Sequence, residues 1–182
     1  MRTDIKFNYS DYRALPEGGK RYQLIDGELL VSPSPKTRHQ ELSSRLYMAL
    51  QVFVSNQKLG RVYYAPLDVI LTDEDVVQPD VFFVSAARAA IVREEGVFGA
   101  PDLCVEILSK SSREIDRDVK RKLYARHGAT EYWIVDPDAD LVQLFRLQED
   151  PERPLRACGS GDTLVSPLFP GFELPLGAVF AR

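Results

Sequence analysis

Two acidic residues stand where apolar segments should form buried strands. Asp80 precedes the apolar run 81–84, and Glu106 interrupts the apolar residues 103–108. An unpaired buried carboxylate costs several kcal/mol, so such acids are usually paired, hydrogen-bonded or bound to a metal ion. Two carboxylates that hold a divalent cation can support phosphodiester hydrolysis, because the ion neutralises the phosphate and activates water. The alternative for Asp80 alone is an acid that caps a turn before a strand.

The segment after Glu106 is basic in an otherwise acidic chain. The 182 residues carry 23 Lys and Arg against 27 Asp and Glu, a net charge of −4. Residues 110–127 hold seven of these cations and three of the acids, so this window is +4 and the rest of the chain is −8. Broad nucleic-acid affinity depends on neutralising phosphates. The composition therefore argues against non-specific binding and leaves one local positive patch.

The composition is that of one globular domain. Apolar residues make up 45% and charged residues 27%, and no linker or repeat divides residues 1–182, so we expect a single domain over this range. Cys104 and Cys158 fit neither a disulfide framework nor a zinc site. The first residues carry no charged-then-apolar leader, and no apolar run approaches the roughly 18 residues of a membrane span. We expect a cytoplasmic protein without a membrane partner.

The elements that would position the two acids form a mixed α/β pattern. The Asp26-Gly27 pair lies between two extended runs and is typical of a β-hairpin turn. Apolar residues with helical spacing predict a long helix that Gly60 ends. The apolar character of 81–84 and 103–108 indicates central strands covered on both faces. In chain order we predict a hairpin over 22–31, a helix over 37–58, extended segments over 61–71, 77–84 and 102–108 with a short helix over 86–93, a helix over 113–126, a hairpin over 131–145, and a last helical turn near 176–180.

The predicted helix over 113–126 would carry the basic residues toward the strand that contains Glu106. Ile115, Val119 and Leu123 recur every four residues and would form its buried stripe. On a helical wheel, Lys122 lies closer to this stripe than Lys120 does.

Several short segments, in this order along the chain, resemble the Uma-type family of restriction endonucleases. They are Tyr22 to Glu28, Ser32 to Pro35 with His39, Gln78 to Val81, Val105 to Ser109, Asp116 with Lys120, and Gly128 to Asp136. That family is placed in the PD-(D/E)xK nuclease-like superfamily. The resemblance implies an α/β, restriction-endonuclease-like fold with a mixed β-sheet core flanked by α-helices, and a Mg²⁺-dependent nuclease activity.

The same resemblance implies a metal site formed by Asp80, Glu106 and the backbone carbonyl of Ile107. Mg²⁺ suits such hard oxygen ligands, with Mn²⁺ as a substitute. Clustered carboxylates repel one another without a cation. We therefore expect Asp80→Asn to leave the metal-free protein as stable as the parent, or more so.

A catalytic lysine is less simply assigned, because the superfamily pattern has a lysine two residues after the glutamate and this chain has Leu108 there. Lys120 matches the family's helix lysine and is our first candidate, in a role that orients water or stabilises the transition state. Lys122 is the rival. The alternative for Lys120 is a surface ion pair with Asp116, four residues earlier in the helix.

Three further residues are candidates for accessory roles. Glu28 could contact a metal or a water from the hairpin, or be an exposed acid at the start of a strand. His39 could touch the site or a phosphate, or be a hydrogen-bonded structural residue. Gln78 could fix the geometry before the strand or donate to a substrate.

Two functions are compatible with these observations. The first is a Mg²⁺-dependent nuclease that acts on nucleic acid, with DNA favoured over RNA, in a homodimer suited to cutting both strands of a duplex. The second is a catalytically degenerate nucleic-acid-binding or protein-interaction module on the same fold, which Leu108 and the acidic net charge support. Titration with a divalent ion separates the two.

Overall fold

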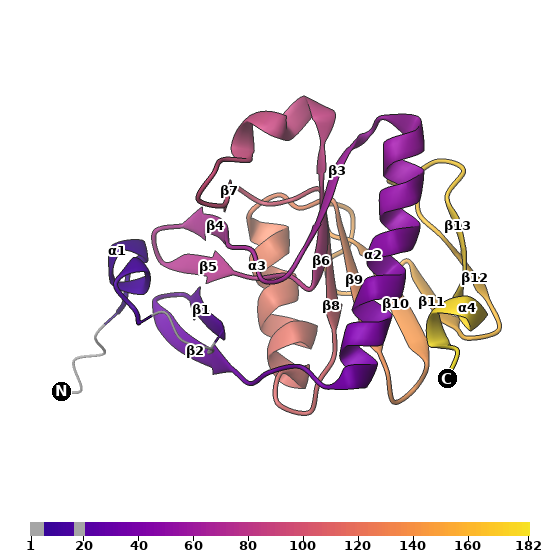
Figure 1. The fold of residues 1–182 in the computed structure, drawn as a ribbon, viewed down its shortest axis with the longest axis horizontal. Helices are drawn as coiled ribbons and strands as arrows, with labels where there is room; N and C mark the ends of the chain where they lie inside the picture. The colour runs from indigo at the N-terminus through magenta and orange to yellow at the C-terminus, as the bar shows by residue number, and fades with distance from the viewer. Residues whose placement is uncertain (1–5, 17–20) are drawn as a thin grey trace.

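The protein, seen in a computed structural model that describes residues 6–16 and 21–182, is a mixed α/β domain (Figure 1). Residues 1–4, on which the expectation of no leader depends, lie outside this range. The helical elements are α1 (Tyr9–Arg13), α2 (Thr37–Gln57), the 3₁₀ helix η1 (Ala86–Ile91), the π-helical turn η2 (Ile115–Lys120), α3 (Arg121–Arg126) and α4 (Leu176–Phe180). The strands are β1 (Arg21–Ile25), β2 (Glu28–Ser32), β3 (Gly60–Tyr64), β4 (Val69–Thr72), β5 (Asp75–Val77), β6 (Val81–Ser85), β7 (Val97–Phe98), β8 (Leu103–Ile107), β9 (Glu131–Asp136), β10 (Leu141–Arg146), β11 (Arg156–Gly159), β12 (Thr163–Val165) and β13 (Glu173–Pro175).

Two mixed sheets organise these elements. The larger sheet has the order β11-β10-β9-β8-β6-β3 and is antiparallel except between β8 and β9, which run parallel. The smaller sheet has the order β2-β1-β5-β4-β7, and β12 pairs with β13 in a third sheet. The predicted α/β class, with a mixed sheet flanked by helices, is confirmed. In the described part of the chain no helix is long and apolar enough to cross a membrane.

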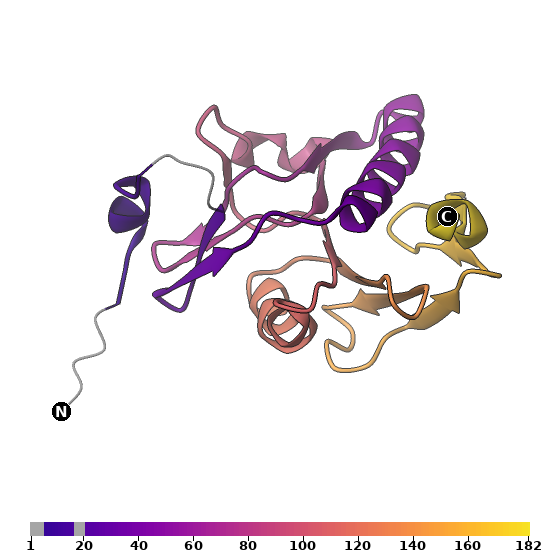
Figure 2. The same cartoon turned by 60° about the horizontal axis from the view of Figure 1, so that its bottom comes forward.

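Helices α2 and α3 cover opposite faces of the larger sheet (Figure 2). Side chains alternate between the two faces along a strand. Val105 of β8 packs with Leu46 of α2 in one apolar cluster, whereas Cys104 of the same strand packs with Tyr124 of α3 in the other. Glu106 therefore points toward the face that η2 and α3 cover.

Two of the predicted extended segments each divide into strands of different sheets. The segment 61–71 becomes β3 and β4 around Pro66, and the segment 77–84 becomes β5 and β6 around Pro79. Proline has no N–H to donate to a strand ladder, so each proline ends the pairing on one side. Asp80 consequently lies where the chain crosses from the smaller sheet to the larger one.

The predicted hairpin and long helix are present, with one shifted boundary. Asp26 and Gly27 form the two-residue turn with φ values of 50° and 78°, and β1 pairs with β2 along its whole length. Helix α2 ends at Gln57, and the residue that caps it in the left-handed conformation is Lys58 rather than Gly60. Gly60 instead opens β3, where a side chain would collide with the Val84 carbonyl.

Candidate active site

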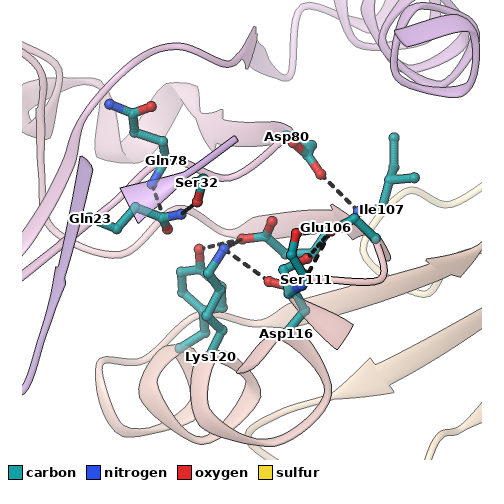
Figure 3. A network of polar contacts seen from close by, with 12 residues as sticks. Gln23, Ser32, Gln78, Asp80, Glu106, Ile107, Ser111, Asp116 and Lys120 are labelled. Atoms are coloured by element: carbon teal, nitrogen blue, oxygen red, sulfur yellow. Dashed lines mark hydrogen bonds and ion pairs between the residues drawn. The ribbon is translucent and has the colours of Figure 1, made fainter. Parts of the chain in front are cut away.

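Asp80 and Glu106 face each other across neighbouring antiparallel strands. Val81 of β6 pairs with Val105 of β8, so one further step along each strand places the two acids opposite one another. Both side chains line a cleft of about 720 Å³. Figure 3 shows the two acids with their polar contacts. Asp80 is 6% exposed and Glu106 is 2% exposed. The cleft therefore brings together two nearly buried carboxylates that are 26 residues apart in the sequence.

Glu106 is held by side chains from the helix that covers its face of the sheet. Its Oε1 atom accepts hydrogen bonds from Lys120 Nζ at 3.0 Å and from the Tyr124 hydroxyl at 3.0 Å. Lys120 Nζ also lies 3.0 Å from Asp116 Oδ1. Because Asp116 and Lys120 are 2% and 3% exposed, their ion pair is buried. The alternative of a surface pair for Lys120 is wrong.

The π-helical turn η2 explains why Lys120 rather than Lys122 reaches the acids. A π-helical turn inserts an extra residue into the helical repeat and so rotates the following side chains relative to an ideal wheel. Asp116 and Lys120 turn toward the sheet, whereas Val119 is 39% exposed. The predicted apolar stripe is therefore wrong at Val119. Lys122 points to solvent and pairs with Asp118 at 2.9 Å.

Asp80 has its own set of partners on the other side of the cleft. Its Oδ2 atom accepts a hydrogen bond from the Ile107 N–H at 2.9 Å and lies 3.1 Å from His39 Nε2. Burial alone would raise the pKa of Asp80, but His39 and the Ile107 N–H hold that pKa below its usual value. Burial lowers the pKa of His39, whereas Asp80 and the Ile107 carbonyl raise it, and the pKa rises overall.

Negative charge is in excess around Glu106. Burial is the main cause that raises the pKa of Glu106 to about 8; Lys120 opposes the increase, and Asp116 and Asp80 add to it. Burial lowers the pKa of Lys120, whereas Glu106, Asp116 and Asp80 raise it, and the pKa rises overall. Three carboxyl groups thus lie around one ammonium, and the raised pKa of Glu106 favours its protonated form there. A bound cation could replace that proton.

Comparison with known proteins places this arrangement in a family. Residues 9–177 match the Uma2 family, described as "Putative restriction endonuclease". The chain belongs to the Uma2 family. The Uma2 fold is also seen in a crystal structure of "a putative nuclease belonging to DUF820" from Anabaena variabilis ATCC 29413. That structure matches with a TM-score of 0.80 and 21% identity, over 96% of this chain and 98% of that one. No curated protein matches the chain.

The accessory candidates of the Uma2 chain lie at different distances from the cleft. His39 lines the cleft beside Asp80, and Gln78 lines it as well. Glu28 is exposed and does not line the cleft. The hairpin places Glu28 next to the turn, whereas Ser32 at the other end of β2 does line the cleft. These two ends of β2 are separated by roughly 13 Å, at 3.3 Å per residue.

Basic and hydroxyl side chains surround the acids of the Uma2 cleft. Besides Lys120, the Lys and Arg residues that line it are Arg21, Lys36, Arg38, Lys110 and Arg182. The loop after β8 adds the hydroxyls of Ser109, Ser111 and Ser112. Sequence reasoning missed Arg21, because its contacts with Gln78 join residues 57 positions apart. Basic side chains around a pair of acids suit a polyanionic ligand. The basic side chains would attract the polyanion, and the acids could hold a metal ion close to its reacting group.

The oxygen donors of this Uma2 site fit a hard divalent cation. Asp80 and Glu106 offer carboxylates and Ile107 a backbone carbonyl, a donor set that suits Mg²⁺ better than softer metals. Within residues 6–16 and 21–182 no group of three or more His, Cys, Asp and Glu side chains could hold a metal ion. Mg²⁺ does not require such a group, because it keeps several waters and is often bound through only one or two carboxylates.

Proposed function

We propose that this protein is a Mg²⁺-dependent nuclease that hydrolyses phosphodiester bonds, with DNA preferred over RNA and Mn²⁺ as a working substitute. The observation that carries the proposal is the opposed pair of buried carboxylates, Asp80 and Glu106, on the floor of a cleft with basic side chains around it. Family membership supports the same reading.

Each side chain of the cluster has a distinct role in this proposal. Asp80, Glu106 and the Ile107 carbonyl would hold the ion, which supplies charge neutralisation and an activated water when bound. The Ile107 N–H orients the Asp80 carboxylate, and Tyr124 orients the Glu106 carboxylate. The ammonium of Lys120 can stabilise the negative charge that develops on the phosphate, because burial makes its field strong.

Two neighbouring lysines provide a matched test of this assignment. We expect supercoiled plasmid DNA to be cut with Mg²⁺ or Mn²⁺ and to remain intact with chelator. Lys120→Ala should lower the cleavage rate by about a hundredfold, the loss typical for one preorganised electrostatic contact. Lys122→Ala removes the same charge from an exposed position and should leave the rate unchanged. Equal loss in both variants, or cutting in chelator, would contradict the proposal.

A degenerate binding module is the second candidate, and two observations favour it. Leu108, at the position of the superfamily lysine, is 3% exposed and packs in the apolar cluster that includes Tyr124. The Lys120 ammonium and the His39 imidazole already contact the two acids, so the fold can hold these acids without a metal ion. Calorimetric titration with Mn²⁺ decides between the candidates, because a degenerate module should give no saturable heat.

We also propose that the protein acts as a homodimer. Cleaving both strands of a duplex with one site per chain requires two chemical events, and a two-fold symmetric pair presents one site to each strand. Sedimentation velocity of the purified protein, with and without a short duplex, should show a species of twice the chain mass. A purely monomeric profile in both samples would contradict it.

A further inference from the structure

Arg21 lines the cleft and forms only a long ion pair, without a hydrogen bond, to an acid there. Its Nε atom donates to Gln78 Oε1 at 3.2 Å, and its NH2 atom donates to the Gln78 carbonyl at 3.2 Å. Both acceptors are uncharged. Its NH1 atom lies 3.8 Å from Asp80 Oδ1, too far for a hydrogen bond. The guanidinium is thus fixed on two sides, and its third nitrogen faces the cleft.

The residue that fixes Arg21 is itself held by a half-buried polar network. Gln78 donates through Nε2 to Asp68 Oδ1 at 2.8 Å and to the Tyr12 hydroxyl at 3.3 Å. Tyr12 donates to the same Asp68 oxygen at 2.8 Å. The Gln78 N–H is directed at Gln23 Oε1 at 3.4 Å, a contact that Figure 3 includes. Every polar group of Gln78 is therefore occupied, so the side chain cannot turn away from Arg21.

Other arginines near the cleft are paired differently. Arg113 and Arg117 donate to the same oxygen of Asp136 at 2.6 Å and 2.8 Å, which is the geometry of charge-assisted structural pairs. Over the described residues, the shortest approach of Arg21 to a carboxylate is the 3.8 Å contact with Asp80. Its side chain is 22% exposed. Arg21 is therefore held in place by Gln78, and its NH1 atom, which makes only the long ion pair with Asp80, can still donate a hydrogen bond.

We propose that Arg21 is a phosphate-binding residue that grips the nucleic-acid backbone beside the Asp80 and Glu106 pair, with Gln78 as its positioning residue. The inference rests on the proposed nuclease function. A guanidinium can donate two parallel N–H groups to a phosphate. An arginine that is already held in place loses little side-chain entropy when it binds, which favours binding. The smaller sheet and α1 then serve the site by orienting this side chain, since β1, Tyr12 of α1 and the residues that flank β4 and β5 supply the contacts.

Binding in the absence of cleavage tests the role directly. We would measure the affinity of a fluorescein-labelled DNA duplex by anisotropy, with chelator present and across a range of salt concentrations. Arg21→Ala should weaken binding at least tenfold and reduce the slope of log affinity against log salt by about 0.9, the value for one lost phosphate contact. Arg61→Ala is the matched control, because Arg61 is exposed on β3 and does not line this cleft; it should leave both quantities near the parental values.

Two further variants protect the test against a folding defect. Arg21→Gln keeps a side chain that can bond to Gln78; it should reduce the salt slope as much as Arg21→Ala does while melting like the parent. Gln78→Leu removes the positioning contacts and should weaken binding less than Arg21→Ala, with the slope retained. Equal affinity and slope for Arg21→Ala and Arg61→Ala would overturn the inference and leave the nuclease proposal standing. Absence of DNA binding by the parent at low salt would overturn both.

Discussion

Two glutamates are almost completely buried on adjacent strands of the larger sheet, and their surroundings are opposite in kind. Glu131 of β9 is fully buried and Glu106 of β8 is 2% exposed. In the parallel pairing of these strands, Glu131 lies opposite Leu103, whereas Glu106 lies opposite Ile134. The two carboxylates thus occupy opposite ends of the same pair of strands. One end is packed and the other opens into the cleft.

Glu131 is satisfied mainly by neutral donors. It accepts hydrogen bonds from Trp133 Nε1 at 3.0 Å, the Ser166 hydroxyl at 2.7 Å and the Leu168 N–H at 2.9 Å, with Arg146 at 3.9 Å. These contacts attach the segment before β13 to the sheet. Glu106, in contrast, shares a lysine with a second carboxylate and faces a third. The comparison teaches that burial alone does not distinguish the two glutamates; competition among carboxyl groups beside a cleft does.

The largest effect should come from removing the charge of Glu106. We expect Glu106→Gln to lower metal-dependent cleavage by about a thousandfold, because metal-assisted charge stabilisation contributes several kcal/mol and each 1.36 kcal/mol is tenfold in rate. Its free energy of unfolding in chelator should not fall, since the amide replaces a carboxyl group whose protonated form is already favoured by burial. Plasmid cleavage rates and urea melts check this. Unchanged cleavage would remove Glu106 from the site.

The corresponding change at Glu131 should show the reverse pattern. Glu131→Gln turns an acceptor into a donor beside three donors, and a buried polar group without a partner costs about 1–3 kcal/mol. We expect the free energy of unfolding to fall by this amount and the cleavage rate per folded molecule to stay at the parental value. Urea melts and active-site-normalised rates measure both. If Glu131→Gln abolished cleavage without destabilising the fold, the contrast between the two glutamates would fail.

The raised pKa of Glu106 predicts a dependence of metal binding on pH. Since the metal must displace the proton, Mn²⁺ affinity should rise about tenfold per pH unit below 8 and level off above it. Between the usual value of 4.5 and about 8 only the folded state holds this proton, so the free energy of unfolding in chelator should fall as pH rises through that window. Mn²⁺ titrations and urea melts from pH 6 to 9 measure the two quantities. In Glu106→Gln, neither the Mn²⁺ affinity nor the free energy of unfolding should show this dependence on pH.

The smallest effect concerns Asp80, where the structure revises our expectation from sequence. The repulsion that we assigned to Asp80 falls on Glu106, because His39 and the Ile107 N–H favour the charged form of Asp80. We therefore expect Asp80→Asn to lower the free energy of unfolding in chelator by about 1 kcal/mol, the typical worth of one hydrogen bond. It should also abolish any stabilisation by Mn²⁺. Thermal melts with and without metal decide; a variant that metal still stabilises would exclude Asp80 as a ligand.

Local patterns in the sequence predicted much of this architecture. The Asp26-Gly27 turn, the helix over 37–58 and the apolar strands at 81–84 and 103–108 follow from turn chemistry and periodicity, which involve near neighbours. The pairing of β6 with β8 then brings Asp80 opposite Glu106. Strand positions were therefore enough to suggest that these two acids meet.

Features that depend on distant partners or on local departures from ideal geometry were not predicted. The change of sheet at Pro66 and Pro79 depends on which strands are available to pair elsewhere in the fold. The π-helical turn η2 changes the helical phase, so an ideal wheel favoured Lys122 over Lys120. Arg21 was missed because its role appears only when Gln78, far away in sequence, is placed beside it.

Lys120 lies on a helical turn, whereas Glu106 lies on strand β8. The cluster is therefore assembled from two structural units. A lysine at the position of Leu108 would be in place as soon as β8 joined the sheet. Here the ammonium and the Tyr124 hydroxyl reach Glu106 only when the helical segment 113–126 has docked. Proteins open locally in cooperative segments well before they unfold globally. Transient undocking of this segment would remove Lys120 and Tyr124 from Glu106 while both acids stayed in an intact sheet. Amide hydrogen exchange in 113–126 would therefore report the fraction of molecules in which the cluster is assembled.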